Sequence, residues 1–351
     1  MTDKKAPTPA EIRAYRAENA KMRERDIAAN LGVSEAALVA AECGISVVRI
    51  DPNPNRLLER APELGTVMAL SRNESAVHEK IGVYEKIEIG EQMSLTLGEN
   101  IDLRIFNWVW KHAFAVTKTD GENVRRSLQF FDKAGEAIHK VHLRPESNLE
   151  AYEKLVADLR LEDQSQEFVA EEFTKLQSGR KEGFDVAELR DAWSKLTDTH
   201  DFFGMLRKLD VDRLAAVRAV GEEYAWKLAD GVIDEFFRKS AESQVNLMCF
   251  VGNKGIVQIH SGPISNIQPM GPWINVMDPT FHLHLRMDHI AETWAVRKPT
   301  KDGHVTSVEA YGKDGELIIQ FFGKRKEGQQ EMAEWRSLVE GLSTTDKAAA
   351  A

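Results

Sequence analysis

The residue best suited to bind a metal is His200, within residues 195–209. If this segment is helical, Phe203 and Gly204 lie on the same helix face as the histidine. A glycine there leaves a flat, open shelf beside the imidazole. Such a shelf suits a large planar ligand, and neutral imidazole is a good ligand for iron. The spacing alone also allows a purely structural histidine.

An arginine and two further histidines stand in segments with strand periodicity. Apolar residues alternate along residues 101–105, so Asp102, Arg104 and Phe106 share the opposite face. The residue 180 positions after Arg104 is His284, which alternates with His282 on one face of another strand. Two histidines so spaced could hold a transition metal, although no third ligand stands nearby. The alternative is a pair of polar residues on the less buried face of a sheet.

Residues 25–42 have the apolar spacing and the glycine-bearing turn of a DNA-binding helix-turn-helix. The second helix of this motif carries Glu35 and Glu42 and no basic residue, so it lacks the groups that contact bases and phosphates. Two packed helices are therefore the favoured interpretation, and nucleic acid is not an expected partner. The sequence contains no P-loop, HExxH or GxSxG motif and no GxGxxG after a strand, which excludes the commonest nucleotide, zinc-protease and serine-hydrolase sites.

The segments that must form the elements positioning these residues occur twice along the chain, as a sequence repeat. Aligning residues 67–68 with 247–248 sets an offset of 180, and this register holds without a gap for about 75 residues. Upstream the match continues at an offset of 178, and downstream at 183. Each half is therefore expected to run through helices, then strands, then one closing helix.

Apolar spacing predicts helices at residues 9–30 and 33–42, with counterparts at 186–209 and 212–228. Ser34 is the expected N-cap of the second helix. From residue 66 to residue 143 the apolar period becomes two, and short turns separate the runs. Short links favour antiparallel meanders over βαβ crossovers. We expect an α+β fold of two tandem, structurally similar halves, each a large antiparallel β-sheet with flanking helices.

The repeat also predicts the organisation of the chain. We expect an N-terminal repeat half at residues 1–163, a charged linker at 164–184, a C-terminal repeat half at 185–345 and a disordered tail at 346–351. The formal net charge of -10 disfavours a protein that binds nucleic acid or an anionic membrane with its whole surface. Two cysteines without CxxC spacing fit a reducing cytoplasm. No run approaches the roughly 20 apolar residues that span a bilayer, so we expect a cytoplasmic protein that is not membrane-embedded.

Several sequence blocks in the same order resemble the HemS/HmuS/ChuS family of cytoplasmic haem-trafficking and haem-degrading proteins. These blocks are SRNE at 71–74, AVHE at 76–79, DLRIF at 102–106, DTHDFF at 198–203, FVGN at 250–253, VQIHSG at 257–262 and RKPTKDG at 297–303. The resemblance covers essentially the whole chain after the first ten residues. It implies two similar halves that hold one haem b in the cleft between them.

The resemblance also implies roles for particular residues. His200 matches the family's proximal histidine, the axial ligand of the haem iron, and Arg104 matches its distal arginine, with a catalytic role. Phe106 would lie against the macrocycle. The residues that would line the pocket or meet the propionates are Arg213, Lys298, Gln320 and Arg325.

This chain departs from the family pattern at several positions. A tyrosine of some members is Phe322 here, beside Ile319, so fewer phenolic hydrogen bonds would hold the propionates. Some members carry further histidines beside the ligand where this chain has Asp201 and Phe203, so ligand switching through a neighbouring histidine is not expected.

Two functions follow from the resemblance. In the first, the protein binds imported haem in the cytoplasm of a bacterium and degrades it oxidatively to release iron, with electrons from an external donor. In the second, it is a non-enzymatic chaperone that passes haem to a separate haem oxygenase. Either function implies transient contact with an inner-membrane haem importer. A DNA-binding regulator that acts through residues 25–42 is the remote alternative.

Overall fold

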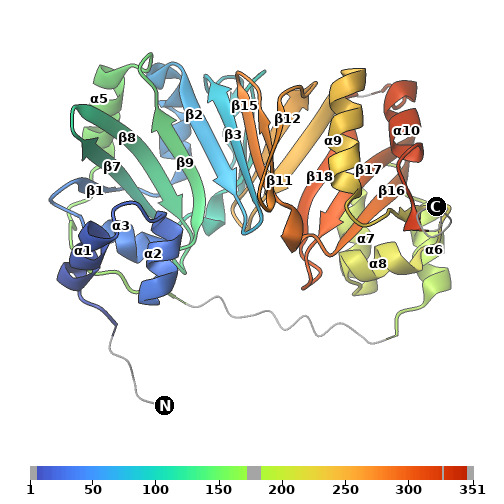
Figure 1. The fold of residues 1–351 in the computed structure, drawn as a ribbon, viewed down its shortest axis with the longest axis horizontal. Helices are drawn as coiled ribbons and strands as arrows, with labels where there is room; N and C mark the ends of the chain where they lie inside the picture. Colours follow the sequence, from blue (N-terminus) through green and yellow to red (C-terminus); the bar gives the residue numbers. More distant parts are fainter. Residues whose placement is uncertain (1–5, 172–182, 326–327, 346–351) are drawn as a thin grey trace. The chain divides into compact units, whose positions relative to one another are not determined.

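The structure is a computed structural model that describes residues 6–171, 183–325 and 328–345 (Figure 1). Its α-helices are α1 (Pro9–Glu18), α2 (Glu24–Leu31), α3 (Glu35–Ala40), α4 (Pro54–Leu58), α5 (Leu149–Leu159), α6 (Val186–Ser194), α7 (Asp201–Leu209), α8 (Arg213–Ala219), α9 (Val232–Ser243) and α10 (Ala333–Glu340). Three 3-10 helices are η1 (Ala61–Leu64), η2 (Asn107–Val109) and η3 (Met287–His289).

The strands of the first half are β1 (Val47–Ile50), β2 (Val67–Arg72), β3 (Ala76–Gly82), β4 (Ile87–Glu88), β5 (Met93–Leu97), β6 (Asp102–Phe106), β7 (His112–Asp120), β8 (Asn123–Phe131) and β9 (Ala137–Leu143). Those of the second half are β10 (Ala225–Lys227), β11 (Leu247–Gly252), β12 (Ile256–Gly262), β13 (Ile267–Met270), β14 (Trp273–Met277), β15 (Phe281–Arg286), β16 (Glu292–Thr300), β17 (Gly303–Tyr311) and β18 (Leu317–Gly323). They form two nine-stranded sheets, ordered β1-β7-β8-β9-β2-β3-β15-β14-β13 and β10-β16-β17-β18-β11-β12-β6-β5-β4. The predicted α+β class with antiparallel sheets is confirmed.

The chain divides into two compact units. Unit 1 contains residues up to Arg72, residues 79–174 and Gly252–Gln258, and unit 2 contains Asn73–His78, residues 175–251 and those from Ile259 onward. Asn73–His78 and Gly252–Gln258 are exchanged segments, because each belongs to the unit that is formed mainly by the other half of the chain. The boundaries predicted from the repeat do not include this exchange. Each segment is held by an asparagine: the Asn253 side chain donates to the carbonyls of Arg72 and Ile138 in unit 1, and that of Asn73 donates to the Ile318 carbonyl in unit 2.

Part of the predicted linker belongs to unit 1. The Gln164 side chain is hydrogen-bonded to both the N–H and the carbonyl of Arg49, and the Phe168 ring packs on His112 with a centroid separation of 4.6 Å. Gln164 and Phe168 of the predicted linker therefore pack against unit 1. Residues 172–182 of that linker and the predicted tail at 346–351 lie outside the described residues.

Three long predicted helices are interrupted. The 9–30 prediction becomes α1 and α2, the 186–209 prediction becomes α6 and α7, and the 212–228 prediction becomes α8 followed by strand β10. The break before α7 has a local cause, since Asp198 accepts a hydrogen bond from the His200 N–H and so competes with the helical backbone. Gly221, with a φ of 94°, turns the chain after α8. By contrast, Ser34 caps α3 as predicted, accepting from the Ala37 N–H.

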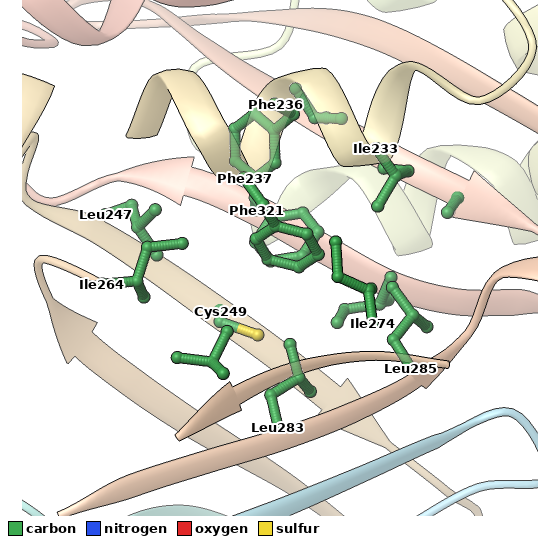
Figure 2. Close-up of a cluster of buried hydrophobic side chains, with 14 of the residues drawn as sticks. Ile233, Phe236, Phe237, Leu247, Cys249, Ile264, Ile274, Leu283, Leu285 and Phe321 are labelled. Carbon is green, nitrogen blue, oxygen red and sulfur yellow. The ribbon is translucent and has the colours of Figure 1, made fainter. Parts of the chain in front are cut away.

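Unit 2 is layered around strands β16–β18. Alternate side chains of these strands face opposite ways, so Trp294, Val296 and Tyr311 pack with α6–α8, whereas Ala295 and Val308 pack with α9 and α10. Figure 2 shows the second core, where Phe236 and Phe237 of α9 meet Phe321 of β18. The candidate site lies on the α6–α8 side, because Lys298 continues the face of Val296.

Candidate functional site

His200 is the exposed N-cap residue of α7. Its side chain is 93% exposed, and the Asp198 carboxylate accepts from its main-chain N–H at 2.8 Å and from ring Nδ1 at 2.6 Å. The hydrogen bond from the His200 main chain lowers the pKa of Asp198, and the Arg325 charge adds to this effect against the opposing effect of burial. A carboxylate on Nδ1 favours the tautomer whose Nε2 carries the lone pair, which is the arrangement of metal-binding histidines.

An aromatic surface follows the histidine along α7. Phe202 is buried against Trp193, at a centroid separation of 4.8 Å, whereas Phe203 is 63% exposed. A Cβ built on Gly204 would meet no atom within 4 Å, so the space beside this turn is open. The sequence predicts an open surface beside His200 within one unbroken helix over residues 186–209. In the structure this surface lies at the start of a separate helix, α7.

A half-buried arginine and a buried lysine share one buried carboxylate beneath this surface. Arg213 of α8 donates to Glu309 of β17 from Nε at 3.0 Å and from a terminal nitrogen at 2.7 Å. Lys298 of β16 donates to the same carboxylate at 2.9 Å, as does Ser307 at 2.8 Å, and the Tyr311 hydroxyl also donates to it. Glu309 is fully buried and Lys298 is 3% exposed.

The electrostatics of this cluster leave one positive charge in excess. Burial would raise the pKa of Glu309, but Arg213 and Lys298 hold it well below its usual range. Burial lowers the pKa of Lys298 to about 8, although Glu309 opposes the shift. Two cations and one carboxylate thus sum to one net positive charge, which an incoming carboxylate would compensate.

Aromatic rings cover the two cations. The Phe202 centroid is 4.7 Å from the Lys298 ammonium and 5.2 Å from the Arg213 guanidinium carbon, and the guanidinium carbon also lies 5.4 Å from the Phe203 centroid. Phe322 of β18 lies 5.9 Å from the ammonium. The rings and cations together can bind a ligand that is apolar and planar over most of its area and anionic at its edge.

The remaining predicted residues of unit 2 lie on β18 or just after it. Gln320 is half-buried and stands opposite Glu309 in the β17–β18 register. Arg325 donates weakly to the Gln329 carbonyl, at 3.4 Å, and it is the cation that acts on Asp198. Unit 2 therefore collects five predicted residues around one surface: His200, Arg213, Lys298, Gln320 and Arg325.

Sequence reasoning missed Glu309 and Tyr311, which organise this cluster. A signal for Glu309 was available in the repeat, because the residue 180 positions earlier is the uncharged Gln129. A charged residue in only one copy of a buried strand position indicates a function specific to that copy. Tyr311 carried no comparable signal, since its counterpart Phe131 is also a large aromatic residue.

Arg104 and Phe106 belong to unit 1. They lie on the half-buried face of β6, as predicted, with Leu103 and Ile105 buried on the other. Arg104 pairs with Asp102 and also donates to the Leu103 carbonyl at 3.3 Å. Burial raises the pKa of Asp102, and the charge of Arg104 opposes this shift.

An exposed aromatic residue that sequence reasoning missed lies next to Phe106. This residue, Trp108, is 58% exposed, and its ring centroid is 5.5 Å from that of Phe106. Met93, opposite Phe106 in the β5–β6 register, is also exposed. The face that carries Arg104 therefore continues into an apolar surface.

Two other sequence hypotheses find no support. In helix α3 of the helix-turn-helix-like segment, five of the six residues are buried, and Glu35 pairs with Arg72, so this helix has no free face for a DNA groove. His284 is hydrogen-bonded to Asn275 through Nδ1 at 2.6 Å. Over the described ranges of the chain, no group of three or more His, Cys, Asp or Glu side chains could hold a metal ion. Within the same ranges, no helix is long and apolar enough to cross a membrane.

Comparison with known proteins extends these observations. The family model described as "Haemin-degrading HemS.ChuX domain" matches residues 32–159 and again 210–342. The hemin transport protein HemS of Yersinia enterocolitica is 36% identical over 342 residues, which are 95% of this chain and 96% of that protein. The solved structure of holo-PhuS, a haem-binding protein from Pseudomonas aeruginosa, matches with a TM-score of 0.91 and 42% identity over 96% of this chain and 100% of that one. The haem-degrading enzyme ChuS of Escherichia coli O157:H7 matches with a TM-score of 0.86 and 31% identity over 95% and 99%.

Proposed function

The chain belongs to the haemin-degrading HemS.ChuX domain family, and on this premise we propose that it binds haem b as part of a bacterial haem-uptake system. The observation that carries the proposal is the surface of unit 2, where an exposed, carboxylate-oriented imidazole stands beside aromatic rings and a cluster with one excess positive charge. Haem needs these three features: an axial ligand, an apolar surface and cations for its propionates.

In this proposal each residue has a distinct task. His200 Nε2 coordinates the iron, and Asp198 holds the ring orientation. Lys298 and Arg213 compensate propionate charge, with Gln320 and Arg325 as further polar contacts, each charge-assisted bond being worth about 1.5–3 kcal/mol where solvent is excluded. Burial of the porphyrin against Phe203 and its neighbours supplies most of the affinity.

We assign Arg104 and Phe106 of unit 1 further roles toward the haem, Arg104 as a hydrogen-bond donor and Phe106 as an apolar contact. An arginine is protonated at any accessible pH and can donate hydrogen bonds to a ligand on the iron. With oxygen and an external electron donor, we expect the bound haem to be opened and its iron released. We place the protein in the cytoplasm, where it would receive haem from an inner-membrane importer. The two cysteines, Cys43 and Cys249, are free and buried, which fits a reducing compartment.

The second candidate function is carriage of haem to a separate haem oxygenase. Similarity supports both candidates, because ChuS is described as a haem oxygenase and PhuS as a haem-binding protein. Both functions use the same surface of unit 2.

Haem titration tests the binding site. We expect His200→Ala to weaken haem binding and to shift the Soret band, because the axial ligand is lost. His282→Ala is the control, since it removes a half-buried histidine of the same unit that lies outside the proposed site, and it should leave the spectrum unchanged. An unaltered spectrum and affinity in His200→Ala would refute the assignment.

Turnover distinguishes the enzyme from the carrier. The ferric haem complex is given a reductant under oxygen, with catalase present because free peroxide degrades many bound haems. Loss of the Soret band with stoichiometric iron release and one defined tetrapyrrole product supports the enzyme. Haem that survives these conditions, and then transfers to an added haem oxygenase, supports the carrier.

A further inference from the structure

Unit 2 offers a porphyrin two kinds of contact, and they are anchored separately in the fold. His200 is the proposed ligand of the iron, whereas Arg213, Lys298 and the rings beside them are the proposed contacts of the organic part. A metal-free porphyrin keeps the planar ring and both propionates but has no iron for the histidine. Its binding therefore depends on whether the second kind of contact needs the first.

His200 has few contacts of its own. Its side chain is 93% exposed, and among the residues that the structure describes the hydrogen-bond partner of its ring is Asp198, which is itself 49% exposed. The segment before α7 is tied to the turn between β16 and β17 by the main chain, since the Lys301 N–H donates to the Thr197 carbonyl at 2.9 Å. An exposed imidazole must lose rotational freedom when it binds iron, which reduces its net contribution to affinity.

The cations, by contrast, are held by the sheet. Glu309 of β17 is fully buried and accepts from Lys298 at 2.9 Å and from Arg213 at 2.7 and 3.0 Å. Ser307 and Tyr311 donate to the same carboxylate. These residues lie on β16, β17 or α8, and none of these bonds involves the segment that carries the histidine. Loss of the histidine therefore leaves the cations in position.

The phenylalanine rings are also arranged around the cations. Phe202 is buried, and its centroid lies 4.7 Å from the Lys298 ammonium. Phe203 is 63% exposed, and its centroid is 5.4 Å from the Arg213 guanidinium carbon. In the described part of the chain, no aromatic ring packs against the His200 imidazole. An apolar plane with an anionic edge thus finds its partners without the histidine.

The charge of the ligand favours the metal-free form. Two cations and one carboxylate leave the cluster with one positive charge in excess. Iron does not alter the propionates, which are the groups that meet this charge. When protons replace ferric iron, the core of the porphyrin loses positive charge, so the metal-free ligand is the more anionic of the two. Stronger attraction to the cluster then offsets part of the lost bond between iron and histidine.

We propose that this surface also binds metal-free porphyrins that carry carboxylates, through the cation cluster and the phenylalanine rings and without His200. This ligand class rests on the function proposed above, since both ligands use the same surface. It widens the range of ligands from haem to porphyrin dicarboxylates, so that the protein holds a porphyrin whether or not the ring contains iron.

Metal-free protoporphyrin IX is the probe, and its fluorescence reports binding to the full chain. We expect saturable binding, with a single porphyrin per chain, that added haem displaces. His200→Ala should change the dissociation constant of the probe by less than about twofold, whereas haem, which loses its axial ligand, should bind at least about tenfold more weakly.

Lys298→Gln removes one of the two cations and should weaken binding of the probe by about tenfold or more. Its matched control is Lys313→Gln, at an exposed position in the β17–β18 turn, which should bind as the unaltered chain does. Thermal unfolding shows whether each variant is folded. Phe203→Ala removes an exposed ring and provides a second test should Lys298→Gln fail to fold. It should weaken the probe by at least about threefold.

Three results would overturn the proposal while haem still binds the unaltered chain. They are no saturable binding of the probe, failure of haem to displace it, and a loss of probe affinity in His200→Ala as large as the loss of haem affinity. Full affinity for the probe in Phe203→Ala and in a folded Lys298→Gln would do so as well. A chain that binds the probe but not haem would instead contradict the function proposed above.

Discussion

Glu309 holds the cations of Arg213 and Lys298 in place in unit 2. It accepts hydrogen bonds from Arg213 and Lys298, and Ser307 and Tyr311 complete its shell. Burial, followed by the charge of Glu309, raises the pKa of Tyr311, so the phenol stays protonated and remains a donor. The cluster is therefore preorganised for an anion before any ligand arrives, which reduces the cost of ordering these side chains on binding.

Haem affinity is expected to fall as the pH rises through about 8. Burial lowers the pKa of Lys298 to about 8, with Glu309 opposing this shift and the Arg213 charge adding to it. A bound propionate raises that pKa, so the complex holds the proton more tightly than the free protein. Affinity then declines by up to about tenfold per pH unit above the free pKa.

The measurement is the dissociation constant from Soret titrations across this pH range. Lys298→Arg keeps a permanent charge and should flatten the profile. A profile for the unaltered chain as flat as that of the variant would contradict this role of Lys298.

Removal of the central carboxylate should destabilise the protein. Glu309→Gln leaves Arg213 and Lys298 buried without their counter-charge, and we expect a loss of about 3–5 kcal/mol in the free energy of unfolding. Urea denaturation measures this loss. Glu316→Gln, at an exposed position, is the control and should change stability by less than about 0.5 kcal/mol. An equally small effect in Glu309→Gln would show that the cations do not depend on this residue.

Among the helices, α7 and α9 use phenylalanine in opposite ways. In α9, Phe236 and Phe237 are both buried against β18 (Figure 2). In α7, Phe202 is buried but its neighbour Phe203 is 63% exposed. Exposure of a large aromatic residue beside His200 is consistent with a binding surface rather than with a packed core.

This contrast predicts opposite effects of two identical substitutions. Phe236→Ala should cost about 3–5 kcal/mol of folding free energy, because it opens a cavity among Phe237, Phe321 and Trp335. Phe203→Ala should leave thermal unfolding almost unchanged but weaken haem binding. Paired denaturation and Soret titrations provide the comparison. A loss of stability in Phe203→Ala comparable to that in Phe236→Ala would assign the residue to the core instead.

At the scale of the whole molecule, the proposed function draws on both units. His200, the proposed axial ligand, and the cation cluster belong to unit 2, and Arg104 belongs to unit 1. Duplication supplies two similar scaffolds, and the residues that differ between copies acquire separate tasks. The pair Arg104 and His284, at the same repeat position, is one such difference.

The proposed division of tasks between the two units predicts that Arg104→Ala still binds haem but opens the porphyrin ring more slowly. If haem affinity depends on unit 2 as proposed, the dissociation constant should change by less than about threefold, whereas loss of the proposed hydrogen-bond donor should slow ring opening by about 10²-fold or more. Single-turnover decay of the Soret band measures the rate. Arg125→Ala removes an exposed arginine of the same unit and is the control. Abolished haem binding in Arg104→Ala would contradict this division.

The sequence by itself determined the repeat, the antiparallel strands, the face of Arg104 and the cap at Ser34. These features depend on local periodicity and on hydrogen bonds between residues that are close together in the sequence. The break before His200 also has a local cause, in Asp198, but the apolar spacing on both sides concealed it.

Only the tertiary structure decided the shared carboxylate of Glu309, the exchanged segments and the packing of Gln164 on the main chain of Arg49. Each depends on residues far apart in the chain, such as Arg213 with Glu309 or Arg49 with Gln164. Whether a buried charge is compensated, and whether a strand edge is covered, is decided by long-range packing, because neither the partner nor the covering segment is adjacent in sequence.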